Sequence, residues 1–274
     1  MKNKTETFAT AIRQFEYKYD LRTVFDDFLT MNVCAFSQNL KTGKSHDEEL
    51  YLETIAKYKE DTLRFEFPKL LAYLITEMTD RMDSNTGNDV LGEFYEQNLQ
   101  RKGASQFFTP WPICTFMAKS TFEVTPEERQ NQPLRILEPA CGSGRMLMAM
   151  LKVAGPYHEY YAVDLDVTCV KMTVVNLFLS GLFRSEVLCG NFLLPEDFRV
   201  SYRTSFLPFG IFRVKEKEQS RLWHLLQNSW NSSKEKEEKK GKHPLKHVLP
   251  RSTSSEDSRL SGFYDPKNPA SVFG

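Results

Sequence analysis

The sequence lacks the features that mark membrane, secreted and metal-binding proteins. No run approaches the roughly 18 consecutive apolar residues that a membrane helix requires, and the first residues contain no apolar signal-peptide core. The five cysteines are odd in number and, like the five histidines, do not stand at metal-ligand spacings. These absences predict a cytoplasmic protein with free cysteines, without a membrane segment and without a metal site.

Net charge is also absent, because 36 Lys and Arg balance 36 Asp and Glu, but the charge is unevenly distributed. Residues 200–251 contain twelve Lys and Arg against five Glu, a local excess of +7. A basic stretch of this kind either contacts phosphate groups or forms a solvated tail. The run from Lys234 to Lys240 mixes both charges and contains no apolar residue, which favours the solvated tail there.

Hydrophobic periodicity divides the chain into three regions. Residues 1–103 carry apolar stripes at helical spacing and are predicted to form a helical region. Residues 104–214 alternate between extended and helical patterns, and residues 215–274 are predicted to be a disordered, basic tail apart from one short helix at 221–230. For the middle region we predict helices at 111–122, 144–154 and 168–182, and strands at 134–138, 160–164 and 186–189.

Strands separated by helices predict an α/β fold with a mostly parallel sheet and right-handed crossovers. A fourth strand at 205–214, interrupted by Pro208, is the last that the pattern indicates.

The most informative segment is the turn between the first predicted strand and the helix that follows it. The strand ends at Glu138, and Gly142 and Gly144 then precede a helical pattern rich in Met and Leu. Glycines let a ligand approach the backbone closely, and the start of a helix offers unpaired N–H groups. The order predicts a cofactor-binding turn, although a tight turn without a ligand produces the same pattern.

The ends of the next two predicted strands carry further candidate ligands. Asp164 closes the second strand, where an acid can accept both hydroxyl groups of a ribose, whereas Asp166 is better placed to cap the following helix. Asn191 and Phe192 follow the third strand, where an amide and an aromatic ring suit an adenine. A plain turn explains the Gly-Asn pair at 190–191 equally well.

Together these segments resemble a known family. Gln106-Phe-Phe-Thr-Pro110, followed by Glu138-Pro-Ala-Cys-Gly-Ser-Gly144, is similar to the S-adenosylmethionine-dependent DNA adenine-N6 methyltransferases, above all the modification subunits of type I restriction systems and related orphan methylases. The helical pattern from Asp89 to Glu96 also resembles the segment that precedes Phe-Thr-Pro in that family. The resemblance covers roughly residues 85–195.

This resemblance implies a Rossmann-like methyltransferase core, S-adenosylmethionine as cofactor, DNA as substrate, and a specificity subunit or second methylase subunit as partner. Thr109, with Gln106 and Phe107 nearby, would approach the methionine end of the cofactor. Asp164 would hold the ribose, and Asn191 with Phe192 would hold the adenine. The cradle of the amino-acid moiety would be formed by Glu138, Pro139, Ala140, Gly142 and Gly144.

The catalytic part of the family pattern is altered. Adenine N6 is a poor nucleophile because its lone pair is delocalised, and the family accepts its hydrogens with an Asn/Asp-Pro-Pro-aromatic loop. The candidate here is Phe206-Leu207-Pro208-Phe209, in which Phe and Leu replace the acceptor and the first proline. Asn268-Pro-Ala-Ser271 lacks the second proline and the aromatic residue. The expected sheet also has fewer strands than the family's.

Three functions therefore remain open at the level of sequence. The chain is a DNA adenine methyltransferase or one subunit of it, or a catalytically inactive relative that binds the cofactor or a partner. A nicotinamide-dependent dehydrogenase is the third reading, but the turn has only two of the three glycines that this class requires.

Overall fold

A computed structural model describes residues 6–37, 45–60, 62–82, 87–100, 107–122, 133–194 and 196–241, with side chains described up to residue 232. The chain divides into one unit of residues 1–233 and a second of residues 234–274. The helices are α1 (Phe8–Ile12), α2 (Leu21–Ala35), α3 (Glu48–Ala56), α4 (Phe67–Asp80), α5 (Val90–Asn98), α6 (Trp111–Thr121), α7 (Arg145–Ala154), α8 (Val167–Leu179) and α9 (Arg221–Gly241). Short 3-10 turns lie at Arg13–Phe15, Thr62–Phe65 and Lys217–Gln219.

A five-stranded sheet in the order β1-β2-β3-β4-β5 forms the centre of the larger unit. Its strands are β1 (Arg135–Glu138), β2 (Glu159–Asp164), β3 (Arg184–Cys189), β4 (Val200–Phe206) and β5 (Phe209–Val214). β1, β2 and β3 pair in parallel, which confirms the α/β prediction for this part. β4 and β5 pair antiparallel, so the expectation of a mostly parallel sheet is wrong beyond β3.

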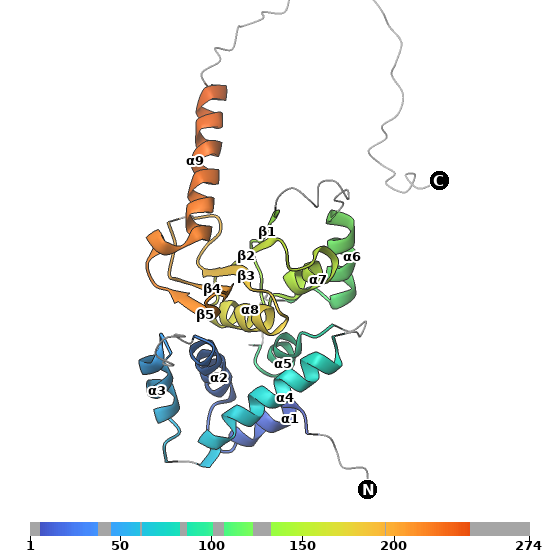
Figure 1. Cartoon of the computed structure of the whole chain (residues 1–274), viewed down its shortest axis with the longest axis vertical. Coiled ribbons are helices and arrows are strands. Elements are labelled where there is room, and N and C mark those ends of the chain that lie inside the picture. The colour runs from blue at the N-terminus through green and yellow to red at the C-terminus, as the bar shows by residue number, and fades with distance from the viewer. Residues whose placement is uncertain are drawn as a thin grey trace, which may run out of the picture. The chain divides into compact units, whose positions relative to one another are not determined.

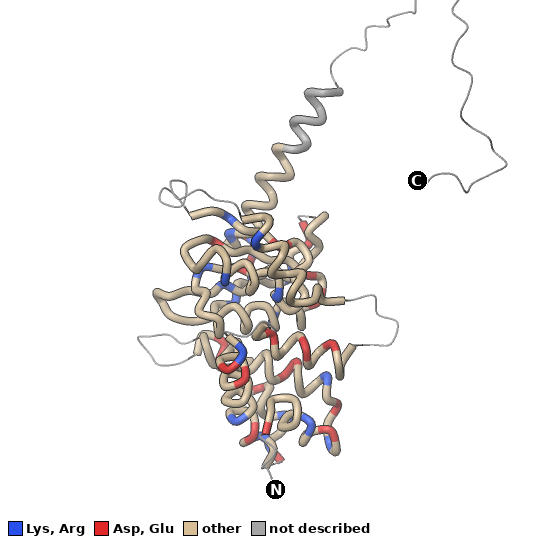
Figure 2. Tube along the Cα trace, turned by 90° about the vertical axis from the view of Figure 1, so that its right-hand side faces the viewer, with Lys and Arg blue, Asp and Glu red and all other residues tan. Residues whose placement is uncertain are grey.

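Helices cover both faces of the sheet (Figure 1). The crossover helices α7 and α8 contribute to one large apolar core, in which α8 is buried on nearly every side. The N-terminal helices share that core, and Figure 1 places them below the sheet region, with α8 facing them. Figure 2 shows basic and acidic residues spread over both parts of the larger unit. On the other face, Leu222 of α9 packs against Tyr161, Val163 and Leu188. Helices and sheet of residues 6–232 therefore form a continuous packed structure.

The N-terminal helices begin where the sequence provides caps. The Asp20 carboxylate accepts from the Thr23 N–H at the start of α2, and the Asp89 carboxylate accepts from the Gly92 N–H at the start of α5. α4 has a proline in its first turn, where the missing N–H does no harm. The described residues up to Asn98 contain α1 to α5.

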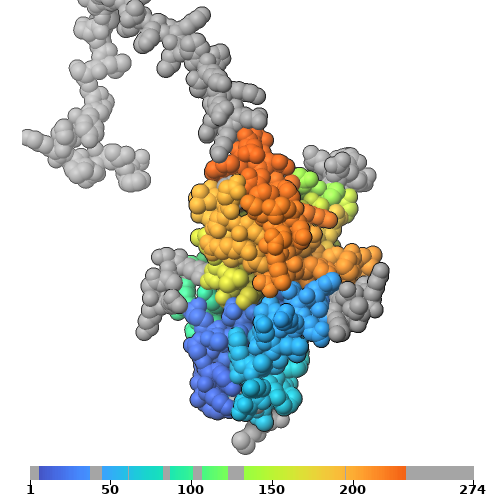
Figure 3. All heavy atoms as spheres, turned by 90° about the vertical axis from the view of Figure 1, so that its left-hand side faces the viewer, coloured from blue at the N-terminus to red at the C-terminus, as the bar shows by residue number. Residues whose placement is uncertain are grey.

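The hairpin β4–β5 is the main departure from the sequence-based prediction. A single interrupted strand at 205–214 was expected, but the structure has two strands, and Leu207-Pro208 forms the turn between them. Proline has no N–H for a strand ladder, so it ends one strand and starts the return rather than interrupting a single strand. β5 lies against the end of α2, since the Ile211 N–H donates to the Phe36 carbonyl (Figure 3).

The C-terminal helix is longer than predicted. The sequence predicted a short helix at 221–230, whereas α9 extends from Arg221 to Gly241. Lys and Glu are good helix formers, and the sequence from 234 to 240 consists of these two residues, which is consistent with the extension. The rest of the predicted tail, residues 242–274, lies outside the described residues.

Candidate functional site

The turn between β1 and α7 has the backbone that its glycines predict. Gly142 and Gly144 have φ values of +55° and +85°, a region that residues with a side chain rarely adopt. A Cβ at Gly142 would lie 2.7 Å from the Phe108 ring, and one at Gly144 would lie 2.9 Å from Thr173 Cγ2. The turn is therefore closely packed on two sides, and glycine is required at both positions.

Asp164 ties the ends of the first two strands together. One carboxylate oxygen accepts from the Gly142 N–H at 2.8 Å, and the other accepts from the Asp166 N–H at 2.9 Å. Asp166 caps α8 through the Thr168 N–H, which is the capping role that the sequence suggested for it. Each carboxylate oxygen keeps a further lone pair, so Asp164 can still accept from a ligand.

A cavity of about 540 Å³ lies where these strand ends meet the Phe-Thr-Pro segment. This volume is in the range of small-molecule sites, roughly 300–1,000 Å³. Six of the predicted cofactor residues line it: Phe107, Thr109, Glu138, Ala140, Gly142 and Asp164. The structure thus brings together residues that are up to 57 positions apart in the sequence.

Burial raises the pKa values of two carboxylates that line this cavity. Burial raises the pKa of Glu138 above its ordinary value, against a weaker effect of the Ala140 N–H, and the charge of Asp164 adds to the rise. Burial likewise raises the pKa of Asp164, opposed by N–H donors that include Asp166 and Gly142. Two adjacent acids in a half-buried hollow give it a negative potential that suits a cationic ligand.

The residues predicted to hold an adenine are not among those that line this cavity. The Asn191 side chain accepts from the Leu193 N–H, and Phe192 packs against the apolar cluster beneath α9. Beside the cavity lies a largely apolar hollow, which shares Leu165 and Asp166 with it. The remaining lining residues of this hollow are Val167, Cys189, Arg199 and Val200.

Three other predicted site residues have different outcomes. Gln106 lies outside the described residues. Pro139 is exposed and does not line the cavity. Gly144 shapes the start of α7 without lining the cavity itself.

The Phe206–Phe209 segment, which was the sequence candidate for the catalytic loop, lies at the end of the sheet opposite to the cavity. β4 runs antiparallel to β3, so the turn Phe206-Leu207-Pro208-Phe209 follows the residue paired with Arg184, at the start of β3. The cavity instead lies at the carboxyl ends of β1 and β2. The length of β3, roughly 15–20 Å for six residues, separates the two. Phe209 packs with Phe178 and Phe183, so this turn is a packing element.

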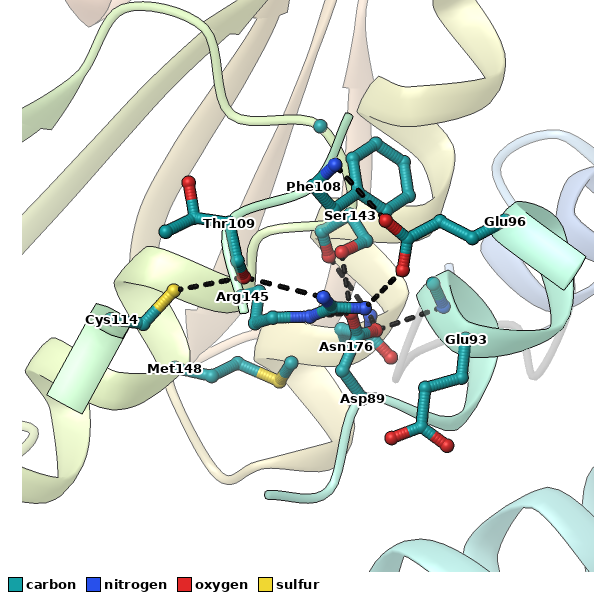
Figure 4. Close-up of polar contacts among 12 residues, drawn as sticks. Asp89, Glu93, Glu96, Phe108, Thr109, Cys114, Ser143, Arg145, Met148 and Asn176 are labelled. Carbon is teal, nitrogen blue, oxygen red and sulfur yellow. Dashed lines mark hydrogen bonds and ion pairs between the residues drawn. The ribbon is translucent and has the colours of Figure 1, made fainter. Parts of the chain in front are cut away.

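A buried polar network behind the cavity was not predicted (Figure 4). It centres on Arg145, the first residue of α7, which donates to Asp89, to Glu96 and to the Thr109 carbonyl. Ser143 and Asn176 also donate to Asp89. One feature of the sequence indicates it: a cation at the start of a helix opposes the helix dipole, so a buried arginine there needs acidic partners. Among the described residues, no group of three His, Cys, Asp or Glu could hold a metal ion.

Comparison with known proteins decides the family of this region. Residues 86–210, from just before α5 into β5, match the family model described as N-6 DNA Methylase. This segment belongs to the N-6 DNA methylase family. The family segment contains the Phe-Thr-Pro stretch, the glycine turn and all the residues that line the cavity.

Single relatives of the N-6 DNA methylase segment are more distant. The chain is 24% identical over 174 residues to the type I restriction enzyme MpnII methylase subunit of Mycoplasma pneumoniae. That alignment covers 59% of this chain and 31% of the relative, so the chain spans about a third of the relative's length.

Two solved structures are also similar to parts of the chain. A methyltransferase subunit of a type I restriction-modification system from Streptococcus thermophilus shows 16% identity and a TM-score of 0.31, covering 66% of this chain and 56% of its own. A class I S-adenosylmethionine-dependent methyltransferase from Listeria monocytogenes shows 18% identity and a TM-score of 0.31, covering 66% and 51%.

Proposed function

We propose that this chain binds S-adenosylmethionine and forms the cofactor-binding part of a DNA adenine-N6 methyltransferase in a restriction-modification system. The observation that carries the proposal is the single cavity in which the Phe-Thr-Pro segment, the glycine turn and Asp164 meet inside the family segment. The three features are far apart in sequence, and a turn without a ligand gives no reason for them to converge.

The lining residues suit the parts of this cofactor. Thr109 and the turn at Gly142 hold the methionine end, and Asp164 accepts from the ribose hydroxyls. The apolar hollow beside Leu165 and Val200 takes the adenine, in place of the Asn191 and Phe192 predicted from the sequence. When bound, S-adenosylmethionine supplies an electrophilic methyl group on a positively charged sulfur.

Charge supports the same ligand. Glu138, Asp164 and Asp166 line the cavity together with Arg145, whose guanidinium is already paired with Asp89 and Glu96. A negative hollow favours a sulfonium cation and disfavours the pyrophosphate of a nicotinamide dinucleotide. The glycine turn itself is compatible with both ligands, so the acidic residues are what favours S-adenosylmethionine over a nicotinamide dinucleotide.

DNA as substrate and other subunits as partners follow from the family and from the relatives' descriptions. An Asn/Asp-Pro-Pro-aromatic sequence is absent from the chain, and the Phe206–Phe209 turn lies away from the cavity. We therefore propose that this cavity binds the cofactor and that the acceptor for the adenine amino group lies outside the residues that form it. The cytoplasm is the proposed location, since the substrate is there.

A calorimetric titration tests the cofactor assignment. The chain is expected to bind one S-adenosylmethionine with micromolar affinity and to show no binding of NAD. Binding of NAD, or of neither ligand at millimolar concentration, would contradict the proposal.

A methyl-transfer assay on adenine-containing DNA then tests the acceptor assignment. The isolated chain is expected to transfer no methyl group, although it binds the cofactor. Transfer by the chain alone would show that its own residues provide the acceptor, and the inactive-relative reading would then be wrong as well.

A further inference from the structure

The network behind the cavity is built around one buried carboxylate. Asp89 is 1% exposed, and its two oxygens accept from four donors. One oxygen accepts from the Gly92 N–H and the Asn176 amide, both at 2.9 Å. The other accepts from Ser143 Oγ at 2.5 Å and Arg145 Nε at 2.8 Å. Asp89 therefore joins α5, the glycine turn and α8.

Arg145 extends this network to the wall of the cavity. Its side chain is 10% exposed, and one terminal nitrogen donates to Glu96 at 2.9 Å. The other terminal nitrogen donates to the Thr109 carbonyl at 3.2 Å. The planar guanidinium thus spans two carboxylates and one carbonyl, a geometry that the single ammonium group of lysine cannot reproduce.

Glu96 holds the same wall from its other side. Its second oxygen accepts from the Phe108 N–H at 3.0 Å. The Phe108 ring stacks on Tyr95 of α5 and lies below the guanidinium of Arg145. The main chain of Phe108 and Thr109 is therefore held at one N–H and one carbonyl by the same ion pair, while Figure 4 shows the Thr109 side chain pointing away from Arg145.

The packing leaves little room for this arrangement to shift. A Cβ at Gly92 would lie 2.1 Å from an Asp89 oxygen and 2.5 Å from Ser143 Oγ. The Phe108 ring also closes over Gly142, as described above. The hydrogen bonds from the Asp89–Arg145–Glu96 network to the Phe108 N–H and the Thr109 carbonyl therefore hold Thr109 in place relative to the glycine turn.

We propose that Arg145 is a positioning residue, which fixes the Phe108–Thr109 wall against the glycine turn and so sets the affinity for the methionine end of the cofactor. This inference rests on the proposed function. Asp164 and the apolar hollow, which would hold the nucleoside, make no hydrogen bond to Arg145. Loss of the network should therefore weaken binding of the methionine end of the ligand and leave binding of the nucleoside end unchanged.

Two variants and three ligands test this. Arg145→Lys keeps the positive charge but removes the planar guanidinium that bonds several acceptors. Glu96→Gln changes a less buried partner, so the test still has a folded variant if Arg145→Lys does not fold. The ligands are S-adenosylmethionine, S-adenosylhomocysteine and 5′-methylthioadenosine, which lacks the amino-acid end. Arg203→Lys is the matched control, because Arg203 pairs with the buried Glu186 and lines no part of the cavity.

We expect affinities for the two ligands that carry the amino-acid end to fall about tenfold in Arg145→Lys, a loss of the size that one charge-assisted hydrogen bond produces. Affinity for 5′-methylthioadenosine should stay within about twofold, and Arg203→Lys should match wild type for all three. In the ligand-free protein, both network variants should show faster hydrogen exchange at the Phe108 amide.

Equal loss for all three ligands would mean that Arg145 only supports the fold, and unchanged affinities with unchanged exchange would mean that it positions nothing. Either result overturns the inference while the proposed function stands. If wild type itself binds none of the ligands, the proposed function fails first, and the exchange measurement still decides whether the network holds the Phe108–Thr109 wall.

Discussion

The carboxylate of Asp164 has two contacts that matter for the site. It accepts from the Gly142 N–H, which holds the glycine turn, and it faces the cavity. A single residue therefore links the shape of the turn to recognition of the ligand.

Replacing Asp164 tests the ribose assignment. In Asp164→Asn, one acceptor oxygen becomes a donor, so affinity for S-adenosylmethionine should fall at least tenfold in a calorimetric titration. Asp20→Ala is a useful contrast, because it removes the cap of α2 and Asp20 does not line the cavity. That variant should lose about 1 kcal/mol of stability and keep its affinity. Wild-type affinity in Asp164→Asn would refute the role in binding.

We expect ionised Glu138 to lower the stability of the folded chain and to raise the affinity for the cofactor. Burial raises its pKa, so its ionised form is less favourable in the folded chain than in the unfolded chain. Its contribution to stability is therefore complete below the ordinary pKa and is lost as the pH rises through the raised pKa. At about pH 8, Glu138→Gln should melt ~1–2 °C above wild type, and the difference should vanish toward about pH 4.

The affinity for the cofactor should depend on pH in the opposite direction. A cationic ligand needs Glu138 and Asp164 ionised, so binding should weaken as the pH falls through their raised pKa values. In Glu138→Gln the affinity should be lower and its pH dependence shallower. An affinity that rises on acidification would contradict the charge argument, and titrations across the pH range distinguish the two.

At the scale of elements, the glycine turn and the hairpin make contrasting predictions. In Gly142→Ala the new methyl group meets the Phe108 ring at a backbone position unfavourable for alanine. The variant should lose roughly 1–3 kcal/mol of stability and most of its affinity for S-adenosylmethionine. Chemical denaturation and titration measure the two effects, and retention of full affinity would place the ligand elsewhere.

The hairpin should matter for stability alone. Phe209→Ala removes ring contacts with Phe178 and Phe183, and because Phe209 is partly exposed we expect a loss of ~1–2 kcal/mol, less than for a fully buried ring. Phe206, which is more exposed and contacts only Phe183 among the described rings, is the matched control with a smaller loss. Both variants should bind the cofactor like wild type, and a selective loss of affinity would return this turn to the site.

Across the whole molecule, elements that are set by local sequence patterns could be predicted, whereas features that depend on contacts between distant residues could not. β1, α7, β2, α8 and β3 were predicted because each has its own apolar period, and parallel strands bring consecutive strand ends to one edge. The meeting of Glu138 and Asp164 at one edge of the sheet follows from that order.

The remaining features depend on contacts between distant segments. β4 carries buried polar residues, Ser201 bonded to Glu186 and Thr204 bonded to Ser185, so it lacks the apolar pattern of a strand. The Asp89–Arg145 pair joins residues 56 positions apart. A cation at the start of a helix indicates that acidic partners are needed, but it does not indicate which residues they are. The contacts of Phe192 are a similar case, since it packs in one cluster with residues of β2 and α9 that are distant in sequence.

A crystal structure of the chain with S-adenosylhomocysteine would show directly whether the ligand occupies the cavity at the carboxyl ends of β1 and β2. We expect the amino-acid end beside Thr109 and Gly142, the ribose hydroxyls on Asp164, and the adenine over Leu165 and Val200. A ligand bound with its ribose away from Asp164, or outside this cavity altogether, would contradict this expectation.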